Sequence, residues 1–375
     1  MSDDEKLHPS TSLGALRVAI DAVDDEILAL LGRRAELATE VAAKKHEAGG
    51  AFYVPARERA IIDRLQAQNR GPFPQASLRP VFQEIISACL SLEAGVRVAY
   101  LGPEATFTHQ AVKRHFGTSA AATPCGSITG VFEEVERGQA AFGVVPVENS
   151  SEGVVSHTLD SFVHSPLKIC AEIVVDVDHC LLARAGVTES AIERVYSHPQ
   201  ALAQCRRWLA QNLARAKVIE AASTADAARA AREDAGGAAI AAELASRIYG
   251  LSVLRRGLQD VADNVTRFLV ISDLEPPPPV TADDGAGSPD KTSVVLALPD
   301  EPGCLVRILE RLSRGGVNLT RIESRPSRRK PWEYVFFLDL DGHCRDPRIA
   351  PVLAELATTC ELFKILGSYR KADSA

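Results

Sequence analysis

The sequence lacks several features that would assign it to a common class of protein. Among its 375 residues no apolar run is long enough to span a membrane, and its first residues are acidic and polar, unlike a secretory signal. It contains no Walker loop and no Gly-x-Gly-x-x-Gly motif, so nothing supports a nucleotide cofactor. The formal net charge of −7 argues against a general nucleic-acid-binding protein.

The cysteines and histidines form none of the familiar ligand patterns. The eight cysteines are scattered without a Cys-x-x-Cys pair, and the nine histidines form no His-Glu-x-x-His motif. We therefore expect reduced thiols in a cytoplasmic protein, with no disulfide framework and no metal site. The composition, 46% hydrophobic and 24% charged, is that of ordinary globular domains, and the length allows two or three of them.

The first segment has the pattern of a helical bundle. From a plausible cap at Ser12, apolar residues recur at alternating spacings of three and four, which predicts a helix about 45 Å long. A helix of that length cannot bury its own apolar stripe, so we expect a partner chain. Pro55 opens a second predicted helix over 57–69, and a third follows over 78–93. The stripe of the first helix consists of Leu13, Leu16, Ile20, Val23, Ile27, Leu30, Leu37 and Val41.

Charged residues interrupt the apolar stripes of these helices. Arg34 falls on the seam of the first helix, and Glu93 continues the apolar spacing of the third. Together with three further cations, Arg34 could hold a small molecule with two carboxylates, because guanidinium groups match carboxylate geometry. Alternatively, the cations are solvated flank residues and Arg34 pairs with a nearby glutamate. The three further cations are Arg17, Lys45 and Arg57.

Residues 13–93 resemble the all-helical chorismate mutase that bacteria fuse to prephenate dehydratase. The resemblance lies in Leu-Arg-x-x-Ile-Asp around Arg17, Leu-Leu-Gly-Arg-Arg-Ala-Glu-Leu around Arg34, Lys45, and Arg57-Glu58. It implies an intertwined helical dimer that rearranges chorismate to prephenate, with Arg17 reaching in from the partner chain and Lys45 and Glu93 as catalytic groups. The residues that would bind substrate within one chain are Arg34, Lys45, Arg57, Glu58, Cys89 and Glu93.

Glu93 stands where many members of that family carry a glutamine that donates to the ether oxygen of the breaking bond. An ionised carboxylate cannot donate a hydrogen bond, whereas a protonated carboxyl group can. We therefore expect Glu93 to be protonated in the active enzyme, so that mutase activity rises toward acid pH.

From residue 96 onward the pattern changes to alternating strands and helices. Short apolar runs and helical periods alternate as far as residue 249, which predicts an α/β domain, and its length suggests two lobes with a cleft between them. Polar residues gather where three predicted strands end, the place where open α/β sheets bind ligands. These groups are Glu148-Asn149-Ser150-Ser151, Tyr196-Ser197-His198-Pro199-Gln200 with Gln204, and Asp263-Asn264-Val265-Thr266-Arg267.

The first of these polar groups, at 148–151, allows two interpretations. A buried strand leads into it, and the residues that follow through Phe162 have a helical pattern. The N-terminus of that helix could bind an anion. Alternatively, Ser150 or Ser151 only caps the helix.

Residues 96–272 resemble the prephenate dehydratase domain throughout. The resemblance lies in Gly-Pro-Glu-x-Thr-Phe-Thr-His, Val-Pro-Val-Glu-Asn-Ser-Ser-Glu-Gly, Tyr-Ser-His-Pro-Gln and Asn-x-Thr-Arg-Phe. That family has two lobes like those of periplasmic binding proteins, with the active site between them. It removes CO2 and water from prephenate to give phenylpyruvate, and because aromatisation drives the reaction, no metal or organic cofactor is implied.

The resemblance places Thr266 beside the hydroxyl group that leaves prephenate. A threonine hydroxyl is a poor acid, so we expect it to donate a hydrogen bond or to relay a proton. Glu148 is the candidate general acid if burial keeps it protonated, although it could equally fix its loop. Arg267 is expected to orient the site or to pair with substrate. The remaining candidate polar contacts are Asn149, Ser150, Ser197 and Gln204.

The last segment is set apart by a linker rich in proline, glycine, serine and aspartate. From residue 292 the pattern predicts strand, helix, strand, strand, helix and strand, a ferredoxin-like unit. We expect the domain limits to be 10–94 for the mutase, 95–273 for the dehydratase, 274–291 for the linker and 292–371 for the last domain.

This last segment resembles the ACT regulatory domain of phenylalanine-pathway enzymes. The matching stretches are Pro302-Gly303-Cys304-Leu305-Val306, Gly316-Val317-Asn318-Leu319-Thr320 and Glu323-Ser324-Arg325-Pro326. Such domains pair and bind L-phenylalanine at their interface, which gives feedback inhibition. The effector contacts implied by the resemblance are Gly303, Cys304, Leu305, Asn318, Leu319, Glu323 and Ser324.

The three resemblances cover nearly the whole chain. They imply a homo-oligomeric enzyme of phenylalanine biosynthesis, a dimer or higher, that acts on chorismate and prephenate and is inhibited by L-phenylalanine. Two alternatives remain: a dehydratase that accepts arogenate as well as prephenate and has weak mutase activity, or a non-catalytic amino-acid sensor. The presence of Thr266, Arg267 and Glu148 argues against the sensor.

Overall fold

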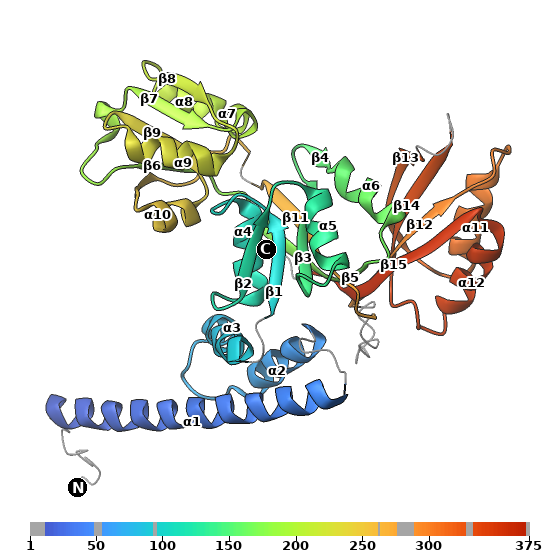
Figure 1. The fold of residues 1–375 in the computed structure, drawn as a ribbon, viewed down its shortest axis with the longest axis horizontal. Helices are drawn as coiled ribbons and strands as arrows, with labels where there is room; N and C mark the ends of the chain where they lie inside the picture. The colour runs from blue at the N-terminus through green and yellow to red at the C-terminus, as the bar shows by residue number, and fades with distance from the viewer. Residues whose placement is uncertain are drawn as a thin grey trace, which may run out of the picture.

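The computed structural model describes residues 12–48, 55–92, 96–261, 263–275, 289–327 and 333–372. Three bodies follow one another along the chain: a helical segment, a two-lobed α/β segment, and a C-terminal sheet with two helices (Figure 1). This order confirms the predicted fold class. No helix within the described ranges is long and apolar enough to cross a membrane.

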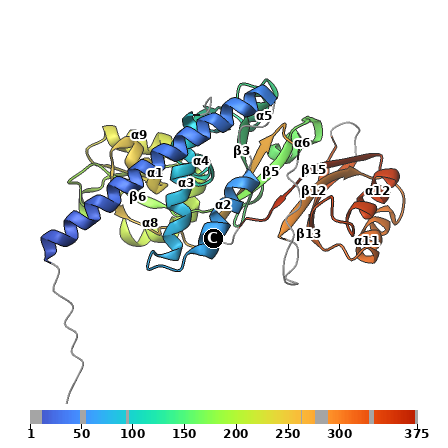
Figure 2. The same cartoon turned by 90° about the horizontal axis from the view of Figure 1, so that it is seen from below.

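Three helices form the N-terminal segment: α1 (Leu13–Ala48), α2 (Pro55–Gln68) and α3 (Gln75–Leu92). Ser12 caps α1 as predicted, because its Oγ accepts a hydrogen bond from the Ala15 amide at 3.2 Å. α2 and α3 pack against each other, and α3 also contacts α1. The N-terminal half of α1 projects beyond the other two helices (Figures 1 and 2).

The apolar stripe of α1 is uncovered in the single chain. Its exposed large apolar residues between Leu13 and Val41 retain 45–69% of their accessible surface. Burying one such side chain contributes about 2 kcal/mol, so an exposed stripe of this length is typical of a surface for interaction with another chain.

The first lobe of the α/β segment is a mixed sheet in the order β2-β1-β3-β11-β5, with the short β4 paired to the end of β3. Helices α4, α5 and α6 pack against this sheet. The strands are β1 (Arg97–Leu101), β2 (Ala121–Cys125), β3 (Phe142–Asn149), β4 (Gly153–Val154), β5 (Lys168–Asp176) and β11 (Val265–Ser272). The helices are α4 (Phe107–Phe116), α5 (Ile128–Glu136) and α6 (Ser156–His164).

The second lobe is a separate sheet in the order β10-β6-β9-β7-β8. The chain enters it after β5 through residues 177–179 and returns to β11 after β10 through 256–261 and 263–264, so two connections join the lobes in the described part of the chain. The strands are β6 (Cys180–Ala183), β7 (Arg194–Ser197), β8 (Lys217–Glu220), β9 (Gly237–Ala241) and β10 (Ser252–Arg255). The helices are η1 (Glu189–Ala191), α7 (Pro199–Gln204), α8 (Arg206–Asn212), α9 (Thr224–Glu233) and α10 (Glu243–Tyr249).

The C-terminal segment has the predicted ferredoxin-like order, with its sheet arranged β13-β14-β12-β15. β12 begins at Asp290, two residues inside the predicted linker. Its elements are β12 (Asp290–Ala297), α11 (Cys304–Arg314), β13 (Leu319–Pro326), β14 (Tyr334–Asp341), α12 (Ala350–Thr359) and β15 (Leu362–Arg370).

The structure corrects the prediction around residues 148–155. β3 continues through Asn149, a turn follows, and β4 pairs back on β3 before α6 begins at Ser156. No helix therefore starts at Ser150 or Ser151, so both the anion-binding and the helix-capping interpretation of these residues were wrong. In the second lobe, α7 ends at Gln204 and α8 begins at Arg206, so the helical stretch is divided at Cys205.

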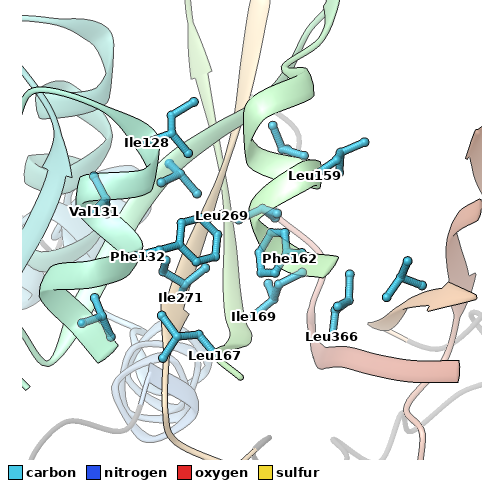
Figure 3. Packing of buried hydrophobic residues seen from close by; sticks show 14 of the residues in the cluster. Ile128, Val131, Phe132, Leu159, Phe162, Leu167, Ile169, Leu269, Ile271 and Leu366 are labelled. Atoms are coloured by element: carbon cyan, nitrogen blue, oxygen red, sulfur yellow. The ribbon is translucent and has the colours of Figure 1, made fainter. Parts of the chain in front are cut away.

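The first lobe and the C-terminal sheet share one hydrophobic cluster (Figure 3). Phe132 of α5 and Phe162 of α6 meet edge to face with ring centroids 5.1 Å apart, and Leu366 of β15 enters the same cluster. Gly367 lies directly on the β5 backbone, where an added Cβ would overlap the Ile169 carbonyl. A close approach of this kind needs glycine, and it fixes the C-terminal sheet against the first lobe.

The helical segment contacts the first lobe through α3. Gln83 Nε2 donates to the His115 carbonyl at 3.0 Å, and the Thr118 hydroxyl donates to Glu84 Oε2 at 2.5 Å. The Ser119 amide donates to Ser87 Oγ at 3.2 Å. These contacts join α3 to the end of α4.

Candidate active sites and effector site

Thr266 and Asn149 lie opposite each other on neighbouring strands of the first lobe. β11 pairs antiparallel with β3 in a register that puts Thr266 against Asn149. Asn149 Nδ2 donates to Thr266 Oγ1 at 2.8 Å and to Asn264 Oδ1 at 2.9 Å. The structure therefore brings together two of the predicted polar groups, those at 148–151 and 263–267.

The turn after β3 fixes the orientation of the Asn149 amide. Its Oδ1 accepts hydrogen bonds from the backbone amides of Ser151 (2.9 Å) and Glu152 (3.0 Å), an Asx turn. Because Oδ1 is held there, Nδ2 faces Thr266. Ser150 Oγ accepts a hydrogen bond from the Val265 amide at 3.0 Å, which ties the turn to the start of β11.

Gln204, at the end of α7 in the second lobe, contacts residues of this candidate site. Its Nε2 donates to Glu152 Oε1 of the first lobe at 3.3 Å, and its Oε1 accepts from Asn264 Nδ2 at 3.2 Å. The same oxygen lies 2.8 Å from His179 Nε2. Gln204 thus occupies the junction of the two lobes, beside the Asn149–Thr266 pair, as expected of a site between lobes.

His179 and Asn264 belong to this candidate site by their hydrogen bonds, although the sequence-based prediction did not select them. His179 lies in the connection from β5 to β6, and Asn264 precedes β11 in the return connection. Burial lowers the pKa of His179, and its hydrogen bond to the Gln204 oxygen and the charge of Asp178 only partly oppose this effect. A neutral imidazole at the lobe junction donates from Nε2 and holds Gln204 in place. Asn264 belongs to a motif noted in the sequence, whereas His179 carries no local sequence signal.

Glu148 and Arg267 pair on the register step next to Asn149 and Thr266. Successive side chains of a strand point to opposite faces, so this pair lies on the other face of the sheet. Arg267 Nη2 donates to Glu148 Oε2 at 2.7 Å, and Arg321 Nε lies 3.3 Å from the same oxygen. Glu148 Oε2 is thus engaged by two guanidinium groups, an arrangement that orients the side chain. The geometry therefore favours Glu148 as a residue that fixes its loop, over the general acid.

Ser197 differs from its expected role. Its side chain is fully buried, and its Oγ donates to the Ile240 carbonyl of β9 at 2.6 Å. The hydroxyl group satisfies a carbonyl inside the second lobe and is not presented to a substrate.

The predicted mutase residues are distributed over all three N-terminal helices. Arg34 Nη1 donates to the Ile85 carbonyl of α3 at 3.4 Å, Cys89 is buried on α3, and Arg57 and Glu58 lie in the first turn of α2. Arg17 is about 25 Å from Arg34 along α1, because the two are separated by 17 residues at 1.5 Å per residue. Lys45 lies in α1, its side chain outside the described set, and Glu93 lies outside the described residues.

The predicted effector residues fall into two groups in the C-terminal sheet. Gly303, Cys304 and Leu305 begin α11, which follows the end of β12, and Gly303 has a φ of +77°. Leu319 pairs with Leu340, which pairs in turn with Thr292 near the start of β12. Leu319 is therefore at the opposite end of the sheet from the start of α11 in one chain, about 16 Å away along that helix. Glu323 and Ser324 lie further along β13, nearer the end of β12 that leads to α11. Asn318 Nδ2 donates to Asp341 Oδ2 at 2.7 Å.

Comparison with known families gives three matches in chain order. Chorismate mutase type II matches residues 16–94, prephenate dehydratase matches 98–276, and the ACT domain matches 292–358. These matches coincide with the three bodies seen in the structure.

Full-length relatives share the same arrangement. The bifunctional chorismate mutase/prephenate dehydratase of Aquifex aeolicus is 49% identical over 366 residues, which cover 96% of this chain and 98% of that protein. The protein of the same name from Pseudomonas aeruginosa is 42% identical over 365 residues, with 96% and 98% coverage. A crystal structure of prephenate dehydratase from Arthrobacter aurescens in complex with L-Phe covers 73% of this chain and 90% of its own, with 39% identity and a TM-score of 0.66. The chain belongs to the family of bifunctional chorismate mutase/prephenate dehydratases, enzymes with two activities and a C-terminal ACT domain.

Proposed function

We propose that the Asn149–Thr266 pair is the centre of the dehydratase active site. The observation that carries this proposal is the 2.8 Å hydrogen bond from Asn149 Nδ2 to Thr266 Oγ1. Because the amide donates to an Oγ1 lone pair, the hydroxyl proton of Thr266 is left to donate elsewhere. Donation to Oγ1 also polarises the O–H bond and strengthens it as a donor.

The reaction then needs little chemistry from the protein. The bond between the ring and its carboxylate breaks, CO2 leaves, and the electron pair enters the ring as the C–O bond to the hydroxyl breaks. Thr266 donates its hydroxyl proton to the departing oxygen, which leaves as water, and the Thr266 oxygen takes up a proton from solvent in its place. Gln204, His179 and Asn264 hold the junction of the lobes in a fixed arrangement around the substrate, so that the departing carboxylate is weakly solvated.

The combined function is tested by supplying chorismate alone to the purified full chain. We expect prephenate to form and phenylpyruvate to follow, with phenylpyruvate suppressed by added L-phenylalanine. Accumulation of prephenate without phenylpyruvate would contradict the dehydratase site. Unchanged chorismate together with turnover of added prephenate would contradict the mutase site.

The mutase site is proposed to form between two chains. Arg17 is too far from Arg34 to reach the same substrate within one α1, and the apolar stripe between them is exposed. Pairing of α1 with the α1 helix of a second chain covers the stripe and brings Arg17 of one chain to Arg34 of the other.

Mixing two inactive variants tests this arrangement. Arg17→Ala and Arg34→Ala chains should each lose mutase activity, because each lacks one contact to a substrate carboxylate. Co-refolded in equal amounts, they should recover about one quarter of the wild-type activity, since half of the dimers are mixed and each mixed dimer has one intact site. If Arg17 acted within its own chain, mixing would recover nothing. Dehydratase activity of each variant serves as the folding control.

The pH profile of the mutase tests the role of Glu93. We expect mutase kcat/KM to increase as pH falls from about 8 to about 5, because the protonated carboxyl group is the hydrogen-bond donor. Glu93→Gln should donate at every pH and give a flat profile over this range. A flat profile in the wild-type enzyme would show that Glu93 does not act as this donor.

The effector site is proposed to form between two ACT domains. Leu319 and the start of α11 are at opposite ends of one sheet, and among the described strands β13 is an edge strand with one side unpaired. The eight residues of β13 leave backbone N–H and C=O groups unpaired along this edge, a surface that proteins usually cover. We propose that the ACT domain of a second copy of the chain covers it. The L-Phe complex of the related dehydratase supports L-phenylalanine as the ligand. We propose the domain limits stated above, a homo-oligomer, and a cytoplasmic location in keeping with the eight free cysteines.

A further inference from the structure

Six charged side chains meet where the dehydratase domain packs on the ACT domain, on the face of β11 opposite Thr266. Five of them are 5–16% exposed, and Glu148 is 35% exposed. The group is called the interdomain charge cluster below. The dehydratase domain contributes Glu148, Glu172 and Arg267, and the C-terminal sheet, the body of the ACT domain together with the first two residues of β12, contributes Lys291, Arg321 and Asp339.

Arg267 is the centre of this cluster. Its Nη2 donates to Glu148 at 2.7 Å, and its Nη1 donates to Asp339 at 3.1 Å and to Glu172 at 3.2 Å. Two of these carboxylates belong to the dehydratase sheet and one to the ACT sheet. Arg267 is therefore held by both domains at once.

The ACT domain completes the charge balance of the cluster. Glu148 and Glu172 carry two negative charges, whereas Arg267 carries one positive charge. The dehydratase residues alone would therefore have an excess negative charge. Lys291 Nζ contacts Glu172 at 2.8 Å and Arg321 Nε contacts Glu148 at 3.3 Å, while Asp339 adds the third carboxylate. Three carboxylates then face three cations, which is what partly buried charges require.

Asp339 is itself held rigidly within the ACT sheet. Ser293 Oγ donates to Asp339 Oδ1 at 2.6 Å, and the Tyr369 hydroxyl lies 2.7 Å from the same Ser293 oxygen. Because Ser293 uses its proton for Asp339, Tyr369 donates to Ser293. This chain of donors leaves Oδ2 of Asp339 aimed at Arg267. A cavity of about 20 Å³, the size of a water molecule, lies among these residues.

The cluster is one residue away from the proposed catalytic pair. Arg267 pairs with Glu148 on the register step next to Thr266 and Asn149, and the register shifts by one residue between Arg267 and Phe268. Such a bulge re-aims the neighbouring side chains and needs local contacts to fix its geometry. Asp339 contacts Arg267, and Arg321 contacts Glu148. Because Arg267 and Glu148 are the chain neighbours of Thr266 and Asn149, these contacts help to fix the backbone that carries Thr266.

We propose that Asp339 and Arg321 of the ACT domain are positioning residues of the dehydratase. They hold Arg267 and Glu148 so that the strands present Thr266 and Asn149 at hydrogen-bonding distance. Arg321 lies on β13 between Leu319 and Glu323, two of the expected effector contacts, so β13 links the effector site to this cluster. The inference rests on the proposed roles of Thr266 and Asn149 in dehydration.

The test uses the full chain carrying Asp339→Asn, which keeps the shape of the side chain but removes its charge. We expect dehydratase kcat to fall about tenfold, since small displacements of catalytic groups have effects of this size or larger. KM for prephenate should change less than about twofold, because the substrate contacts remain. Asp339→Glu should recover part of kcat, and the mutase activity of the same preparation should be unchanged. Arg321→Met should lower kcat in the same direction and weaken inhibition by L-phenylalanine.

Lys168→Met is the matched control for loss of an interdomain contact. Lys168 Nζ donates to the Ile365 carbonyl of β15 at 2.8 Å and belongs to the same interface, but it does not touch Arg267. This variant should keep its dehydratase kcat. Wild-type kcat and wild-type inhibition in both Asp339→Asn and Arg321→Met would overturn the proposal, as would equal losses in Lys168→Met. These outcomes are separate from that of Thr266→Ala, which alone decides the catalytic role of Thr266.

Discussion

Thr266→Ala is expected to lower dehydratase kcat by about 10²- to 10³-fold while leaving the mutase unchanged. The substitution removes the hydroxyl group that donates to the departing oxygen, and loss of one aimed donor in an active site has effects of this size. It also leaves Asn149 Nδ2 with two acceptors, Asn264 Oδ1 and the Val265 carbonyl, so the strand pairing survives. The measurement is prephenate turnover, with chorismate turnover by the same preparation as the folding control.

Thr266→Ser and Thr266→Val separate the hydroxyl group from the shape of the side chain. Serine keeps the donor and should retain most of the activity, whereas valine keeps the shape and should behave like alanine. The loss should appear in kcat more than in KM, because a donor to the leaving group acts in the transition state. Full activity in Thr266→Val would falsify the assigned role.

The candidate dehydratase site could be predicted from the sequence where its residues belong to continuous motifs. Asn149, Thr266 and Arg267 belong to short stretches at strand ends, and the strands themselves follow from their apolar runs. The error at 150–155 has a local cause. The helical pattern of α6 was extended backward over a hairpin, although Gly153, whose φ is +84°, is a residue typical of such turns.

His179 shows what a single sequence does not contain. It stands alone between β5 and β6, and it joins the site because the described chain crosses between the lobes twice, at 177–179 and at 256–261 with 263–264. The partners of Arg267 raise the same difficulty. Asp339 is 72 residues away in the sequence and lies in another domain. Such a contact depends on how two sheets pack, which periodicity within each sheet does not specify.

Ser197 shows the converse of a missed residue, because the sequence pattern selected it although the structure gives its hydroxyl group a structural partner. Its position after a predicted strand suggested a substrate contact, but the hydroxyl group is used by the Ile240 carbonyl. A polar residue at a strand end has many structural uses, and the choice among them depends on burial.

Arg267→Met is expected to destabilise the dehydratase and ACT domains by about 3–5 kcal/mol, the usual result of removing one partner from a buried ion pair. Burial opposes the positive charge of Arg267, but the carboxylates of Asp339 and Glu172 outweigh it and hold the pKa above its ordinary value. Without the guanidinium group these two carboxylates, both less than a tenth exposed, lose a shared partner. The midpoint of thermal unfolding should fall by several degrees.

Arg137→Met provides the matched control, since Arg137, at the C-terminal cap of α5, makes an exposed pair with Glu133 at 2.9 Å. Its loss should change stability by no more than about 0.5 kcal/mol. Arg267→Lys keeps the charge but replaces a planar fork by a single ammonium group, which cannot reach Glu148, Glu172 and Asp339 with the same geometry. It should regain more stability than dehydratase activity, because balancing the charge stabilises the domain interface, whereas the directions of three hydrogen bonds position Thr266. Equal recovery of both quantities would mean that Arg267 affects dehydration through stability alone.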